Sequence, residues 1–165
     1  MEAALIELVG VHRLTNEIRG LGTNEFPRRP LVDFVMECSP KQVDIDVPCL
    51  LIRINKRFEY GMNDEALYES TRGIWVIGHR RYSARFAMAV YAGIVREVYE
   101  IESWHRAGST PYKTRDPQEL AQKYARRWEF VGHVAQPVVR KKYIGGSVGH
   151  LFRHGQQNPV VGVGL

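Results

Sequence analysis

Apolar and polar residues alternate in the middle of the chain, and this two-residue period predicts β-strands. The clearest case is the stretch VDIDVPCLLIRI, residues 43–54. Val43, Ile45 and Val47 alternate with two aspartates, and the more continuously apolar run CLLIRI follows. We therefore predict one strand over residues 43–54, with its second half more buried than its first.

Residues 85–104 are predicted to form a β-hairpin. Two β-rich runs, RFAMAVY and IVREVYEIESW, are separated only by Ala92-Gly93. A two-residue connection of this kind favours a tight turn between antiparallel strands. The alternation on the first arm puts three large side chains on one face and two alanines on the other: Phe86, Met88 and Val90 against Ala87 and Ala89.

Shorter elements surround this hairpin. Further strands are predicted at GIWVIG (73–78), WEFVG (128–132) and VVGVG (160–164), and a polar loop at 105–117. Helices are predicted at 2–18, at 31–38, from Asn63, from Pro117 and, as a turn, in the stretch beginning PVVRKKY. Short strands with intervening short helices indicate an α+β fold, a small, twisted and partly closed β-barrel with an appended N-terminal helix. We expect residues 1–40 to be that helix with its linker, and residues 41–165 to be the domain.

Composition supports an ordinary folded domain. The 165 residues are 44% hydrophobic and 25% charged, which excludes wholesale disorder. The two cysteines, Cys38 and Cys49, are expected to be small core residues in a reducing compartment. Glu2 and Glu7 interrupt the apolar start, and no apolar run is long enough to span a bilayer. We therefore expect a cytoplasmic protein without membrane contact.

Positive charge is concentrated in the second part of the chain. The net charge is +5, made up of −1 over residues 1–60 and +6 over residues 61–165. The excess occurs in three clusters: Arg80-Arg81, Arg126-Arg127 and Arg140-Lys141-Lys142. Such clusters are typical of surfaces that bind phosphates, so DNA or RNA is the expected partner. The alternative is a basic surface that only contacts water.

Each of the three tryptophans falls at a predicted strand end or start, beside charged residues. An aromatic ring can stack a base while arginines hold the phosphates. The nucleic-acid-binding residues predicted in this way are Arg72, Trp75, Arg80, Arg81, Trp104, Arg127, Trp128, Arg153, Gln156 and Asn158.

Six of these residues also have a structural interpretation. The tryptophans would be core residues whose indole N–H finds a partner. Arg72 would pair with Glu69 or Glu97. The amides of Gln156 and Asn158 would close a turn.

The sequence contains no self-contained active site. No Glu-x-Lys follows a carboxylate as in restriction-type nucleases, and GGSVG (145–149) lacks the lysine and spacing of a P-loop. His150 and His154 lack the additional ligands that a metal site needs. We therefore predict no catalytic residue, no bound metal and no cofactor.

The first segment, EAALIELVGVHRLTNEIRG (2–20), resembles the closing helix of GIY-YIG nuclease domains. In that family a glutamate opens this helix and ligates the metal, so the resemblance implies such a role for Glu2 alone. The family's two signature tripeptides lie roughly ten residues apart on neighbouring strands. Here Gly73-Ile74-Trp75 and Tyr143-Ile144-Gly145 are about seventy residues apart, so they do not form that pair.

The larger part of the chain, roughly 43–161, resembles an uncharacterised domain that follows such a nuclease in some bacterial proteins. The matching stretches are TRGIWVIG, AVYAGIVREVYEIESW, RWEFVG, KYIGGSV and FRHGQQNPV. Their strand pattern is similar to that of PUA-like barrels, which often bind RNA or modified bases.

The leading hypothesis is a non-catalytic nucleic-acid-binding domain of PUA-like type that recognises an unpaired, flipped or modified base. One alternative is part of a GIY-YIG-type metal-dependent endonuclease, active only as a homodimer or with a partner domain. The other is a protein-interaction domain left after a nuclease was lost.

Overall fold

The computed structural model describes residues 31–38 and 40–165. The predicted helix at 2–18, the linker after it and Glu2 lie outside the described residues. The strands are β1 (Cys49–Arg53), β2 (Gly73–Trp75), β3 (Phe86–Tyr91), β4 (Ile94–Arg106), β5 (Trp128–Val134) and β6 (Val160–Val163). The helices are α2 (Leu31–Cys38), α3 (Asp64–Arg72), η2 (His79–Ser83), α4 (Pro117–Tyr124), α5 (Pro137–Tyr143) and η3 (Gly149–Leu151).

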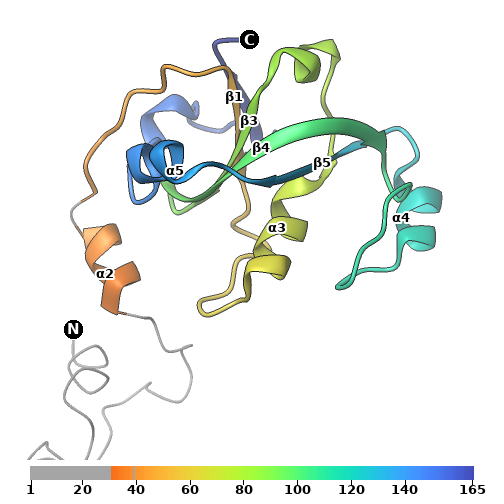
Figure 1. Ribbon diagram of the computed structural model, residues 1–165, viewed down its shortest axis with the longest axis horizontal. Coiled ribbons are helices and arrows are strands. Elements are labelled where there is room, and N and C mark those ends of the chain that lie inside the picture. Colours follow the sequence, from red (N-terminus) through yellow and green to blue (C-terminus); the bar gives the residue numbers. More distant parts are fainter. Residues whose placement is uncertain (1–30, 39) are drawn as a thin grey trace, which may run out of the picture.

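The strands form one curled sheet with the order β2-β5-β4-β3-β1-β6 (Figure 1). β1 runs parallel to β3, and the other neighbours are antiparallel. The helix α3 lies below the sheet in this view, α5 lies at the left and α4 at the far right. The fold is thus α+β, a twisted half-barrel with short helices, as the sequence predicts. No helix in the described ranges is long and apolar enough to cross a bilayer.

The predicted hairpin is confirmed as β3 and β4. Ala92 and Gly93 both have positive φ, 51° and 79°, which a tight two-residue turn between twisted strands requires. β4 does not stop at Trp104, however, but continues to Arg106 and pairs with β5 along its second half. The predicted loop at 105–117 is therefore wrong for its first two residues, because the partner strand β5 extends the ladder.

The predicted strand over residues 43–54 is confirmed only from Cys49 to Arg53. Val43, Ile45 and Val47 are nevertheless half-buried against the core, while the aspartates between them are exposed. The alternation therefore identifies the buried side correctly, although these residues have no strand partner. One backbone bond fixes the segment, from the Val43 N–H to the carbonyl of Ser147 at 3.1 Å.

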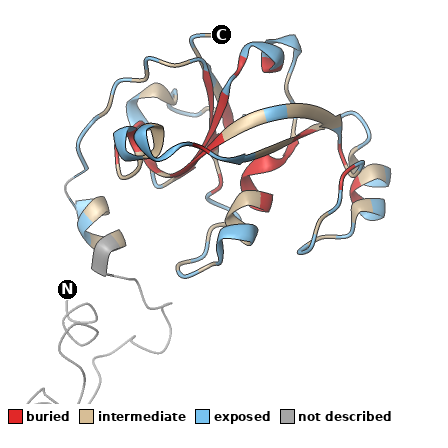
Figure 2. Cartoon of the chain, viewed as in Figure 1, coloured by how far each residue is buried: buried red, intermediate tan, exposed pale blue. Residues whose placement is uncertain are grey.

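Two apolar clusters lie on opposite faces of the sheet. Figure 2 shows the buried stretches of the strands in red. Phe86, Met88 and Val90 belong to the cluster that α5 covers, whereas Ala87 and Ala89 belong to the cluster under α3. This division confirms the predicted faces of the hairpin. The alanines leave room for the large side chains that α3 brings against the sheet.

The helices α3 and α4 begin where the sequence predicts them. The side chain of Asn63 accepts the amide of Ala66 at 2.8 Å at the start of α3. The side chain of Asp116 accepts the amide of Gln118 at 2.8 Å at the start of α4, which Pro117 opens. Each cap satisfies an amide that the helix itself leaves unpaired.

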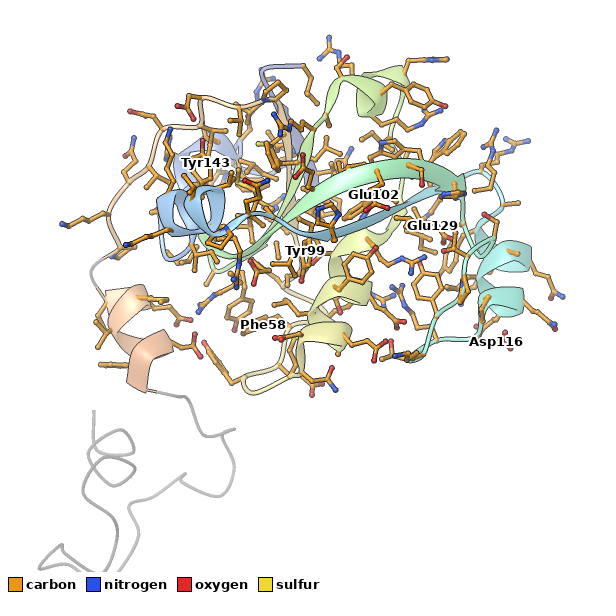
Figure 3. The ribbon with its side chains drawn as sticks, viewed as in Figure 1. Phe58, Tyr99, Glu102, Asp116, Glu129 and Tyr143 are labelled. Atoms are coloured by element: carbon orange, nitrogen blue, oxygen red, sulfur yellow. The ribbon has the colours of Figure 1, made fainter. Side chains whose placement is uncertain are left out.

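A fully buried carboxylate, Glu129 on β5, organises the loop between β4 and α4. It accepts the amides of Gly108 and Thr110 at 2.8 and 3.0 Å and the hydroxyls of Thr110 and Tyr112 at 2.6 and 2.9 Å. Burial, and then the charge of Glu129, raise the pKa of the Tyr112 phenol, so it stays a donor to Glu129. Figure 3 places Glu129 at the end of the sheet nearest α4.

Glu69 near the end of α3 holds the next part of the same loop. Its carboxylate accepts the amides of Lys113 and Thr114 at 2.6 and 2.9 Å, and the hydroxyl of Thr114. Arg115 ties this region back to α3 and β2 through the carbonyls of Glu69 and Gly73. The two buried glutamates thus bind the backbone N–H groups of Gly108, Thr110, Lys113 and Thr114, which ties this largely exposed polar loop to the core.

The cysteines differ from the prediction, because Cys49 is buried in the core but Cys38 is exposed on α2. Burial raises the pKa of the Cys49 thiol to about 12. We therefore expect a thiol reagent such as Ellman's reagent to modify one cysteine per chain in the native state and both in denaturant. Cys38→Ser should abolish the native reaction, and rapid modification of both thiols would contradict this burial of Cys49.

Glu129→Ala should destabilise the domain by about 3–5 kcal/mol, because it leaves several buried donors and the Arg72 charge without their partner. Urea unfolding followed by circular dichroism measures the change. Glu59→Ala, at an exposed position, is the matched control and should stay within about 0.5 kcal/mol of the wild type. Should Glu129→Ala fail to fold, Glu129→Gln gives the same test with a smaller expected loss. Wild-type stability in the glutamine variant would show that the carboxylate does not hold this loop.

Candidate nucleic-acid interface

The ten predicted site residues lie in three places. Five lie at the end of the sheet where β2, β4 and β5 meet η2: Trp75, Arg80, Arg81, Trp104 and Trp128. Arg72 and Arg127 lie beside this end but make contacts within the protein. The other three belong to the turn before β6, at the opposite edge of the sheet: Arg153, Gln156 and Asn158.

Trp128, the first residue of β5, is at the centre of the first group. The strand register sets it opposite Trp75 of β2 and Arg106 of β4. Two guanidinium groups lie over its ring, with the central carbon of Arg81 at 3.6 Å and that of Arg106 at 4.1 Å from the ring centroid. These distances are well within the range of attractive cation–π contacts.

Arg81 is almost completely buried in η2, and its guanidinium is held from several sides. It donates to the carbonyl of Gly78 at 2.9 Å and to the hydroxyl of Tyr82 at 2.7 Å. Its central carbon also lies 4.2 Å from the centroid of the Tyr82 ring. The Arg81 guanidinium therefore links Tyr82 to Trp128 and cannot leave without breaking these contacts.

Trp75 and Trp104 are half-buried and satisfy their indole N–H groups within the protein. Trp75 donates to the carbonyl of Thr71 at 2.7 Å, and Trp104 donates to the carbonyl of Arg81 at 3.0 Å. Both rings pack against the apolar cluster under α3. These contacts give both tryptophans a structural role at the edge of the site, where they support η2 and β2.

Three exposed cations lie at this end of the sheet: Arg106 over the Trp128 ring, Arg126 two residues before Trp128, and Arg80 next to Arg81 in η2. Arg80, Arg106 and Arg126 are all exposed, and no carboxylate of residues 31–38 or 40–165 pairs with them. Arg85, by contrast, is neutralised by Glu100 at 3.0 Å. We call the surface formed by the six residues Arg80, Arg81, Tyr82, Arg106, Arg126 and Trp128 the Trp128 surface.

Arg72 points into the protein. It is 6% exposed, donates to Thr110 and to the carbonyl of Pro111, and lies 3.8 Å from Glu129. Its ion pair is therefore with Glu129, and neither Glu69 nor Glu97, the two partners considered from sequence, takes that place. Arg127 is half-buried, and its guanidinium lies 4.6 Å from the centroid of the Tyr124 ring.

The turn before β6 is closed by its own amides. The side-chain amide of Gln156 donates to the carbonyl of Asn158 at 2.9 Å, and the side-chain oxygen of Asn158 accepts the amide of Val160 at 3.1 Å. Arg53 of β1 donates to the carbonyl of Gln156 at 2.6 Å. An open hollow of about 610 Å³ lies beside this turn, and Arg153 is among its lining residues. These three residues are thus well separated from the Trp128 surface.

Three members of the Trp128 surface, Tyr82, Arg106 and Arg126, were not among the predicted site residues, although Arg126 belongs to the charge cluster Arg126-Arg127. The sequence signal for Arg106 is its two-residue spacing from Trp104, which places both on the same face once the strand continues. Tyr82 follows Arg80-Arg81 directly, but only the geometry of η2 shows that its ring meets Arg81.

The Trp128 surface combines fixed positive charge with planar groups and contains no carboxylate among its members. Arginine N–H groups bind phosphate oxygens, and guanidinium or aromatic planes accept bases. Such a combination can bind an anion that carries planar groups.

Arg81→Lys should destabilise the domain by about 1–3 kcal/mol, because a lysine cannot keep both hydrogen bonds and the planar contact with Trp128. Arg80→Lys, at the exposed neighbour, is the matched control and should leave the stability within about 0.5 kcal/mol. Urea unfolding monitored by tryptophan fluorescence measures both. Equal stability of the two variants would show that Arg81 is not a fixed part of the surface.

Known proteins provide no further guide to the site. No protein-family model, no curated protein and no solved structure matches the chain. The resemblance to GIY-YIG-associated and PUA-like domains therefore stays a prediction, and the function has to be argued from the Trp128 surface.

Proposed function

We propose that the chain is a non-catalytic nucleic-acid-binding module of PUA-like α+β type, which binds the phosphate backbone at the Trp128 surface. The observation that carries this proposal is the set of three exposed arginines at this end of the sheet, Arg80, Arg106 and Arg126, whose charges no described carboxylate neutralises. An uncompensated group of cations on a rigid support attracts a polyanion and releases its condensed counterions on binding.

The rigidity of the support favours this function. η2 presents Arg80 on a segment that Arg81 and Trp104 fix to the sheet. Arg106 projects from a paired strand, and Arg126 lies two residues before β5. Cations on such supports lose less conformational entropy on binding than cations on a free tail.

Nucleic acid fits better than a protein partner. The large apolar side chains exposed in the described part of the chain are Val35, Val76, Tyr82, Val134 and Val138. They are distributed over α2, the segment after β2, η2, the end of β5 and α5. A protein-binding surface would instead concentrate such residues in one patch. The endonuclease alternative depends on Glu2, which lies outside the described residues.

Fluorescence polarisation with labelled single- and double-stranded oligonucleotides at low salt tests the proposal. The wild type should bind with an affinity that falls as salt rises. Replacing Arg80, Arg106 and Arg126 together by alanine should weaken binding at least tenfold. The slope of log K against log salt concentration should fall in magnitude by about two to three, because each lost phosphate contact removes roughly one unit of slope.

The matched control removes the same charge elsewhere. Lys41, Lys56 and Lys141 are exposed and lie on other parts of the domain, so their joint replacement by alanine should have a much smaller effect. If the wild type shows no salt-dependent binding, the proposed function is wrong. If both triple variants lose affinity equally, the binding is general attraction to net charge and the Trp128 surface is not its site.

A further inference from the structure

Four planar groups of the Trp128 surface form one continuous series. Tyr82 contacts Arg81, Arg81 contacts Trp128, and Trp128 contacts Arg106, with ring-to-guanidinium distances of 4.2, 3.6 and 4.1 Å. We call these four residues the stacked column. Aromatic and cationic groups alternate along it, so that each cation lies against at least one ring and each contact is attractive.

The two inner members of the column are fixed, and its outer members are exposed. Arg81 is 4% exposed and hydrogen-bonded, and Trp128 begins a paired strand. Tyr82 is 62% exposed at one end. Arg106 is exposed at the other end, and in the described ranges its guanidinium has no bond or contact other than the Trp128 ring.

The Arg106 end has the properties of a base-stacking platform. Its guanidinium lies over Trp128 on an exposed residue, and none of its N–H groups donates a hydrogen bond within the described ranges. A guanidinium that stacks on one ring has a second planar face that can take another flat group, and its N–H groups can bind a phosphate. The Tyr82 end is less free, because the Tyr82 hydroxyl is bonded to Arg81 and the His79 ring lies 6.1 Å away, tilted by 49°. The column can therefore be extended by one further flat group at Arg106.

We propose that the Arg106 end of the stacked column binds an unpaired nucleobase, so that the module prefers single-stranded nucleic acid to a duplex. The inference rests on the proposed function and adds a ligand class to it. Bases in a duplex have both faces covered by their neighbours, whereas an unpaired base offers a face for stacking on an arginine or aromatic plane. Arg126 and Arg80 would then hold the phosphates on either side.

The test compares two variants that keep every charge. Arg106→Lys removes the planar group at the end of the column, and Arg57→Lys makes the same change at an exposed arginine after β1, outside the Trp128 surface. Each full-length protein is titrated with a 3′-fluorescein-labelled twelve-residue oligo-dT strand and with the same strand annealed to oligo-dA. Circular dichroism melting verifies that both variants are folded.

The wild type is expected to bind the single strand more tightly than the duplex. Arg106→Lys should weaken single-strand binding about tenfold, with an unchanged salt slope and unchanged duplex binding, because stacking rather than charge is lost. Arg57→Lys should bind both probes like the wild type. Quenching of tryptophan fluorescence by the single strand should be smaller in Trp128→Phe, which keeps an aromatic ring in the column.

The outcomes separate this inference from the proposed function. If Arg106→Lys binds the single strand like the wild type, or loses the same factor for both probes, the stacking site is wrong while salt-dependent binding still supports the module. If the wild type binds the duplex as tightly as the single strand, the preference for unpaired bases is wrong. If the wild type binds neither probe, the proposed function fails and the inference with it.

Discussion

The buried carboxylate of Glu129 is the interaction on which this end of the molecule depends. It collects donors from residues 108–112 and lies near the charge of Arg72 at the end of α3. Trp128 is the residue immediately before it. Because Glu129 ties β5 to the loop after β4 and to the end of α3, it also fixes the strand ends from which Trp128 and Arg106 project. A polar network in the interior thus determines the geometry of the surface.

Much of the fold follows from local patterns in the sequence. The hairpin was predictable because its alternating period and its two-residue turn both point to the same structure, and α3 and α4 were predictable from Asn63, Asp116 and Pro117. Strand ends were less predictable. β4 continues beyond the residues that the sequence predicts as a strand, because β5 pairs with it. Residues 43–47 alternate between apolar and polar side chains but have no partner strand. Strand pairing depends on segments that are distant in the sequence, and the local alternation of apolar and polar residues carries no information about them.

The candidate site was predictable as a region but not as a set of residues. Neighbouring arginines and tryptophans indicated the segment around η2 and the start of β5. Arg80 and Arg81 are consecutive, yet one is exposed and the other buried, because the turn of η2 directs the second toward Trp128. Burial of Arg72 likewise required knowing that Thr110 and Glu129 approach α3 from elsewhere in the chain. Sequence composition identifies where charge is abundant, but only packing decides which charges reach solvent.

The arrangement of β1 has a consequence for how the domain is completed during translation. β1 is the first strand in the sequence. Its neighbours in the sheet are β3, more than thirty residues later, and β6, more than a hundred residues later. Such non-local pairing is intrinsically slow to form. Until residues 160–163 have left the ribosome, one side of β1 has only unpaired amides and carbonyls. An unpaired edge of this kind is where another chain can add a strand, so pairing with β6 closes the last open side of β1.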